Sequence, residues 1–107
     1  MSEQLQLTIY INEADRHEDG PLHEYLVRRM LRLHIAGATV LRGAMGFGKH
    51  GRLHEKRLFG VSDDRPVVII AVDDEQRIRD IVGEIRRLVP DGLVTLHRVD
   101  LIKSEIP

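Results

Sequence analysis

The chain has 107 residues, a formal net charge of −1 at pH 7 and no cysteine. This length suits residues 1–107 folding as a single domain around one hydrophobic core. The near-neutral charge excludes nucleic-acid binding through bulk positive charge. The lack of cysteine excludes disulfides and thiolate metal sites. No secretory signal pattern opens the sequence and no apolar run is long enough to span a membrane, which predicts a cytoplasmic protein.

The first part of the chain predicts a strand, a helix and a second strand. Apolar residues alternate with polar ones over residues 5–11, which is the period of a strand with one buried face. Apolar residues at helical spacing follow Pro21, and we expect this helix to end at Gly37. Residues 38–45 then have the composition of another strand.

The second part repeats this plan. Residues 66–73 predict a strand, residues 78–89 carry one continuous apolar helical stripe, and residues 93–102 predict a final strand after a Pro-Asp-Gly turn. The order is therefore βαββαβ. It predicts an α+β, ferredoxin-like fold in which two helices cover one face of a four-stranded antiparallel sheet.

The strand over residues 66–73 does not suit a lone two-layer domain. It is apolar on both faces, although the helices are expected to cover only one face of the sheet. Another surface must bury the open face. Because every copy of the chain carries the same surface, we expect self-association.

Residues 43–51 read GAMGFGKHG and nearly match a P-loop. The match fails at His50, where the motif needs Ser or Thr, and no helix is indicated after it. The glycines would still let backbone N–H groups approach an anion, and residues 46–60 carry a local charge of +3, from four basic residues and one acidic residue. An anion is therefore the expected ligand. The alternative is a solvated hairpin loop whose basic residues serve solubility.

The segment GATVLRGAMGFGKHG, followed by a charged loop and RPVVIIAVDDE, resembles part of the PII signalling proteins. There a Gly-x-Thr-Val strand leads into the Gly-Phe-Gly stretch that opens the T-loop. The chain is most similar to a short PII-like bacterial family, domain of unknown function 190, from residue 5 to about residue 102. This resemblance implies a ferredoxin-like fold, a homotrimer whose sheets face the centre, and an adenine-nucleotide site in the cleft between subunits.

The resemblance also implies site residues. Thr39 would lie near the adenine, Gly46, Phe47 and Gly48 would bring backbone to the phosphates, and Lys49 would replace the usual arginine. No resident cofactor is implied, and the expected ligand is AMP, ADP or ATP. PII proteins carry a second glycine- and lysine-rich loop before the last strand, whereas residues 89–92 contain no lysine. AMP, ADP or a cyclic nucleotide therefore fits the sequence as well as ATP.

The histidines raise a second possibility. His50 and His54 are four residues apart, which on a helix would place two zinc or copper ligands on one face. Gly51 weakens a helix there, and no third ligand is indicated nearby. No Ser or Cys nucleophile stands with a recognisable base, so we expect no enzyme activity.

These observations predict a cytoplasmic, trimeric, nonenzymatic nucleotide sensor. A flexible basic loop over about residues 46–62 would engage a partner through Arg52, Lys56 and Arg57, and the resemblance implies a membrane transporter or channel as that partner. The main alternative is a trimeric divalent-metal-binding protein resembling the cation-tolerance family, which shares the fold. A nucleic-acid-binding role, as an RNA-binding module, is disfavoured because the strands lack the aromatic pairs that stack bases.

Overall fold

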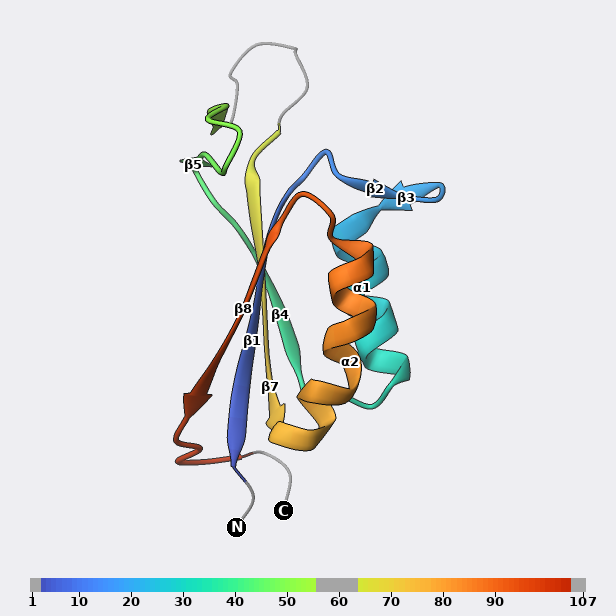
Figure 1. Cartoon of the computed structure of the whole chain (residues 1–107), viewed down its shortest axis with the longest axis vertical. Helices are drawn as coiled ribbons and strands as arrows, with labels where there is room; N and C mark the ends of the chain where they lie inside the picture. Colours follow the sequence, from blue (N-terminus) through green and yellow to red (C-terminus); the bar gives the residue numbers. More distant parts are fainter. Residues whose placement is uncertain (1–2, 56–63, 105–107) are drawn as a thin grey trace.

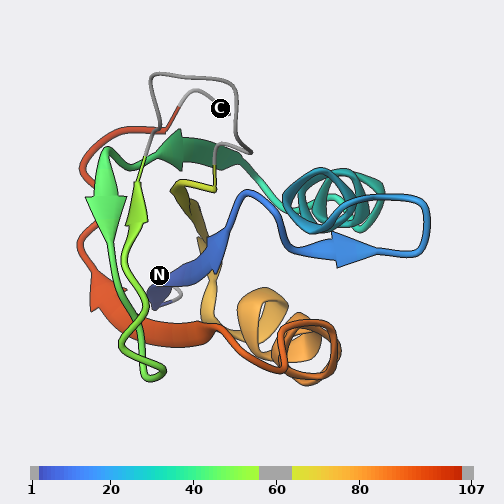
Figure 2. The same cartoon turned by 90° about the horizontal axis from the view of Figure 1, so that it is seen from above.

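The computed structural model describes residues 3–55 and 64–104 and confirms the ferredoxin-like prediction (Figure 1). Four antiparallel strands form a sheet in the order β4-β7-β1-β8. Their bounds are Gln4–Asn12 for β1, Ala38–Arg42 for β4, Pro66–Asp74 for β7 and Leu93–Val99 for β8. Helices α1 (Leu22–Arg32) and α2 (Glu75–Leu88) lie side by side on one face, as Figure 2 shows.

Two short strand pairs lie outside the main sheet. One joins β2 (Arg16–His17) to β3 (Gly20–Pro21) in the segment before α1. The other joins β5 (Met45–Gly46) to β6 (His54–Glu55) and forms the base of a hairpin. Sequence periodicity did not indicate either pair, because strands of two residues are too short to show a period. In the part of the chain described here, neither helix is long and apolar enough to cross a membrane.

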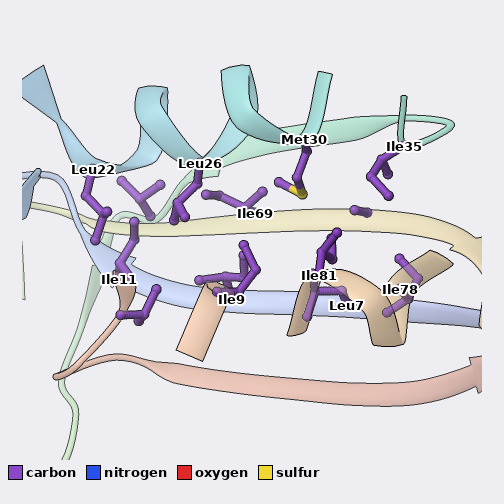
Figure 3. Packing of buried hydrophobic residues seen from close by; sticks show 14 of the residues in the cluster. Leu7, Ile9, Ile11, Leu22, Leu26, Met30, Ile35, Ile69, Ile78 and Ile81 are labelled. Atoms are coloured by element: carbon purple, nitrogen blue, oxygen red, sulfur yellow. The ribbon is translucent and has the colours of Figure 1, made fainter. Parts of the chain in front are cut away.

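The core lies between the helices and the sheet. Alternate residues of β1 point toward the helices and are buried, as the strand period predicts, and the apolar stripes of both helices pack onto them (Figure 3). The fully buried side chains include Leu5, Leu7, Ile9, Leu26, Met30, Ile69, Ile78 and Ile85. This one layer of contacts holds both helices to the same face.

Helix α1 ends before Gly37, so the predicted helix end is wrong. Its last residue is Arg32, and His34 takes a left-handed conformation with φ of 61°. The His34 amide donates to the carbonyl of Leu31 at 3.1 Å, and the Ile35 amide donates to that of Met30 at 3.1 Å. These two bonds are a Schellman motif, which closes a helix and is usually built on glycine. The buried contact of Ile35 and Met30 with the core supports the motif without one.

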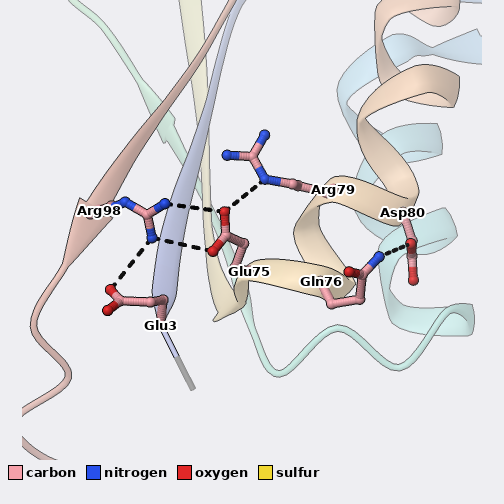
Figure 4. A network of polar contacts seen from close by, with 6 residues as sticks. All are labelled: Glu3, Glu75, Gln76, Arg79, Asp80 and Arg98. Carbon is pink, nitrogen blue, oxygen red and sulfur yellow. Dashed lines mark hydrogen bonds and ion pairs between the residues drawn. The ribbon is translucent and has the colours of Figure 1, made fainter. Parts of the chain in front are cut away.

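Ion pairs join the elements around the core. Near the chain termini, Glu75 of α2 accepts hydrogen bonds from Arg79 at 2.8 Å and from Arg98 of β8 at 3.2 Å (Figure 4). The hydrogen bond from Arg79, followed by that from Arg98, lowers the pKa of the Glu75 carboxyl. Arg98 also reaches Glu3, which precedes β1, at 3.4 Å. This network therefore connects β8, α2 and the start of the chain.

The face of the sheet away from the helices, here called the open face, is partly apolar. Register places Leu41, Val68, Tyr10 and Leu93 in one row across all four strands. The next row holds Thr39, Ile70, Thr8 and Thr95. Strand β7 contributes apolar residues to both faces, as predicted: its helix-facing residues are buried, and those on the open face are half-buried. Tyr10, Leu41 and Leu93 are exposed large apolar side chains on this face.

Candidate functional site

A pocket of about 620 Å³ opens where four segments meet at one end of the sheet. These segments are the end of β1, the glycine-rich residues 43–49, the start of β7, and the turn between α2 and β8. All four lie at the end of the sheet away from the chain termini (Figure 1). We call this site the Lys49 pocket; its lining consists of Tyr10, Ile11, Asn12, Gly43, Met45, Gly46, Phe47, Gly48, Lys49, Pro66, Val68, Asp91, Gly92 and Leu93.

The glycine-rich segment lies close against the first residue of β7. The amide of Gly43 donates to the carbonyl of Pro66 at 2.8 Å. A Cβ added at Gly43 would lie 3.2 Å from Pro66 Cγ, and one at Gly46 would lie 3.1 Å from the same atom. Glycine at these two positions therefore lets the segment approach the sheet without pushing Pro66 aside. The pairing of β5 with β6 then brings residues 54 and 55 back beside Met45 and Gly46.

The turn between α2 and β8 forms the opposite wall. A Cβ added at Gly92 would lie 2.3 Å from Val89 Cγ1 and 2.6 Å from the carbonyl oxygen of Tyr10. No real side chain fits at such distances, so glycine is needed for this turn to pack on β1. The packing holds the neighbouring Asp91 at the rim of the pocket.

The charges of the pocket come from this turn and the glycine-rich segment. Among the residues that line the pocket, Lys49 is the one with a basic side chain and Asp91 is the one with an acidic side chain. Lys49 Nζ lies 4.0 Å from Asp91 Oδ1, and His50 Nε2 lies 3.8 Å from the same oxygen. The side chains of Lys49 and Asp91 are 61% and 75% exposed, so water reaches both groups.

Two arginines near the pocket are held by another acid. Arg42 Nε donates to Glu13 Oε1 at 2.6 Å, and Arg65 Nε lies 3.6 Å from Glu13 Oε2. Glu13 follows β1 directly. These arginines are not among the residues that line the pocket, so among its described lining residues Lys49 is the group that attracts an anion.

The walls are mostly apolar. Tyr10 and Phe47 provide aromatic rings, Leu93 and Val68 provide aliphatic groups, and Phe47 is 77% exposed. Pockets with apolar walls and a few placed polar groups are typical of small-molecule sites. A flat ring carrying an anionic group matches this arrangement chemically.

The structure brings four of the five predicted nucleotide residues together. Gly46, Phe47, Gly48 and Lys49 line one pocket. Thr39 does not line it; it lies on the open face of β4, opposite Ile70. Strand alternation explains this position, because Ala38 and Val40 on either side of Thr39 pack against the core.

The remaining predicted residues are less closely placed. Arg52 is exposed between Gly51 and β6. Lys56 and Arg57 lie outside the described residues, as do residues 58–62 of the loop predicted to be flexible. His54 belongs to β6 and pairs with Gly46 through the backbone. Within residues 3–55 and 64–104 no group of three or more His, Asp or Glu side chains is placed to hold a metal ion.

Tyr10, Asp91 and Leu93 are among the lining residues of the Lys49 pocket that sequence reasoning missed. Tyr10 was assigned only to a strand, and Asp91 and Leu93 only to a turn and the strand after it. The Pro-Asp-Gly pattern predicted the turn, but it did not predict that the turn lies beside residues 43–49. That closeness depends on the fold of the whole chain.

Comparisons with known proteins agree with this fold. The model of the DUF190 family, described as "Uncharacterized ACR", matches residues 4–101. A UPF0166 protein of Aquifex aeolicus is 33% identical over 96 residues, 90% of each chain, and one of Methanocaldococcus jannaschii is 30% identical over 100 residues, 92% of each chain.

Solved structures with a similar fold include CPII, a nitrogen regulatory PII-like protein from Thiomonas intermedia K12. Its structure bound to ADP, AMP and bicarbonate matches with a TM-score of 0.69 and 23% identity, over 91% of this chain and 86% of that one. Its apo form matches with a TM-score of 0.59 and 19% identity, over 91% of this chain and 89% of that one. The fold is therefore PII-like.

Proposed function

Because this chain belongs to the DUF190 family and has a PII-like fold, we propose that it is a nonenzymatic regulatory protein that binds an adenine nucleotide in the Lys49 pocket. One observation carries the proposal: residues 46–49, which the sequence predicts to hold a nucleotide, line a single pocket with aromatic walls and one cation. A CPII structure with a similar fold contains ADP and AMP, which supports an adenine nucleotide as the ligand.

The chemistry of the pocket supports each part of such a ligand. Tyr10 and Phe47 offer aromatic surface to a base, and a phosphate near Lys49 would form a charge-assisted contact. Backbone N–H groups of Gly46 and Gly48 have no side chain to keep a phosphate away. The volume of about 620 Å³ lies in the range of small-molecule pockets.

The pocket also borders the open face. Tyr10, Val68 and Leu93 line the pocket and form a row of that face. A second copy that covers the open face would therefore reach the edge of the pocket, and Thr39 lies on the same face. This supports a homotrimer with the ligand in a cleft between subunits, where a neighbouring chain completes the site.

The proposed output is a change at the basic loop. The glycine-rich segment that lines the pocket leads directly to Arg52 and then to Lys56 and Arg57. A ligand that fixes residues 46–49 would bias the chain that follows, in the way that signalling proteins use ordering of a segment. We propose that these basic residues bind a partner in the cytoplasm, a membrane transport protein being the class that the PII resemblance implies.

A thermal-shift screen of AMP, ADP, ATP and divalent metals tests the proposal. A ligand at one hundred times its dissociation constant adds about 2.7 kcal/mol to stability, which raises the melting temperature by roughly 10 °C in a domain of this size. We expect a rise with at least one adenine nucleotide. A response to zinc or copper alone, lost in His50→Ala, would replace the proposal with the metal-binding alternative.

A further inference from the structure

We propose that Asp91 determines which nucleotides the Lys49 pocket prefers, because its carboxylate competes with the ligand's phosphate for Lys49 and repels each added phosphate charge. In this arrangement the additional phosphates of ATP bring little gain in affinity over AMP. The inference rests on the proposed function and concerns the same pocket.

The first support is the position of the carboxylate. Asp91 Oδ1 lies 4.0 Å from Lys49 Nζ and 3.8 Å from His50 Nε2, so one oxygen faces both basic groups. An anion entering the pocket must approach the same cation. The carboxylate of Asp91 therefore stands where the phosphate of a ligand would bind.

The second support is the weakness of this ion pair. Its two side chains are 61% and 75% exposed, and exposed pairs contribute little to stability. A phosphate with better geometry and a larger charge can take over Lys49. Asp91 would then lose its partner but stay close to the ligand.

The third support is that the turn carrying Asp91 packs closely on β1. Gly92 lies so close to Tyr10 and Val89 that a Cβ there would be 2.6 Å from one and 2.3 Å from the other. Pro90 on the other side restricts the backbone further. The displaced carboxylate therefore remains at the rim of the pocket and repels the ligand.

This repulsion grows with the charge of the ligand. ATP carries roughly two more negative charges than AMP. At about 5 Å in a water-like medium with physiological salt, one carboxylate weakens binding by about two- to fourfold for each ligand charge. Asp91 should therefore lower the affinity for ATP, relative to the affinity for AMP, by about four- to sixteenfold. This offsets the affinity that a triphosphate would otherwise gain from Lys49.

The test is isothermal titration of AMP and of ATP, both without magnesium, into the full chain and its Asp91→Asn variant. The amide keeps the size and turn preference of the acid but removes its charge. We expect Asp91→Asn to bind both nucleotides more tightly and to raise the ratio of the AMP to the ATP dissociation constant by about fourfold or more. In a Lys49→Ala background the tightening should shrink, because there is no cation left to compete for.

Asp100→Asn is the matched control. It removes the same charge but lies after β8, whose first residue Leu93 lines the pocket and whose seven residues span about 23 Å. The ratio of its AMP dissociation constant to its ATP dissociation constant should equal that of the unchanged protein. If both nucleotides bind and Asp91→Asn leaves the ratio unchanged, Asp91 does not set the preference and the proposed function stands. If neither nucleotide binds either protein, the proposed function fails and this inference fails with it.

Discussion

Gly92 packs so closely on Tyr10 that a Cβ at this glycine would lie 2.6 Å from the Tyr10 carbonyl oxygen. This contact joins the turn between α2 and β8 to the end of β1. Both segments line the Lys49 pocket, so the shape of the pocket depends on the contact. The carbonyl oxygen belongs to a central strand and cannot move aside as a side chain can.

Gly92→Ala should therefore destabilise the protein. The added methyl group must push the turn away from β1, and overpacking of this kind costs about 1–3 kcal/mol. Urea unfolding followed by circular dichroism measures the change. Gly37→Ala is the control, because a Cβ at Gly37 meets nothing within 4 Å. Equal stability of the two variants would show that the turn has room that the structure does not indicate.

Ile70→Lys should dissociate the proposed trimer. Ile70 lies in the middle of the open face and outside the Lys49 pocket, so a charge there would be buried by a second copy. Light scattering should give a trimer mass for the unchanged protein and a monomer mass for the variant. Leu31→Lys makes the same kind of change at a residue of α1 that is 73% exposed, and it should remain trimeric. A monomer mass for the unchanged protein at micromolar concentration would rule out the trimer.

The ion pair between the helices should make stability depend on pH. Arg29 donates to Glu84 at 2.7 and 3.1 Å, and these hydrogen bonds lower the pKa of the Glu84 carboxyl. Because the pKa is lower in the folded than in the unfolded chain, the pair stabilises the fold fully above about pH 4.3, where the unfolded carboxyl is ionised. This contribution is lost as the pH falls through the lowered folded value.

Glu84→Gln tests that pH dependence. The variant should melt at a lower temperature than the unchanged protein at pH 7, and the difference should shrink by pH 3. The effect should be small, because both side chains are about one third exposed. Thermal unfolding at the two pH values measures it, and a difference that is as large at pH 3 as at pH 7 would contradict the assignment.

His34→Gly should stabilise the protein by about 0.5–1 kcal/mol. His34 has φ of 61°, a conformation that glycine adopts without strain and that is strained for a residue with a Cβ. The hydrogen bond from Arg77 to the His34 carbonyl at 3.0 Å uses the backbone and should persist. Thermal and urea unfolding measure the gain. His34→Ala keeps the strain and should show no gain, so equal stabilisation by both variants would point to another cause.

The sequence predicted the fold well because its signals are local. The alternation in β1 and the stripe of α2 follow from periods of two and 3.6 residues, and the structure buries those faces. The two-sided apolar pattern of β7 likewise predicted an open face that is partly apolar. The end of α1 was mispredicted because a glycine such as Gly37 is the usual sign of a helix end. In the structure His34 closes the helix instead, and the burial of Ile35 supports it there.

The candidate site was only half predictable. The glycines and the lysine of residues 46–49 indicated a binding segment in the sequence. The opposite wall of the pocket comes from the turn at residues 91–93. No local pattern connects two segments so far apart in the chain. Asp91 fits the composition of any turn, and its closeness to Lys49 appears only when the sheet places both segments at one end.

The binding of an adenine nucleotide through Lys49 is the central claim, and calorimetry tests it most directly. AMP, ADP and ATP are titrated into the unchanged protein, into Lys49→Ala and into Lys103→Ala, which removes an exposed lysine beyond β8 as a control. At least one nucleotide should bind, and Lys49→Ala should weaken it about 10- to 100-fold, as expected for losing a hydrogen bond to a charged group. Lys103→Ala should bind like the unchanged protein. No measurable binding of any of the three nucleotides by the folded protein, or equal affinity in Lys49→Ala, would contradict the account.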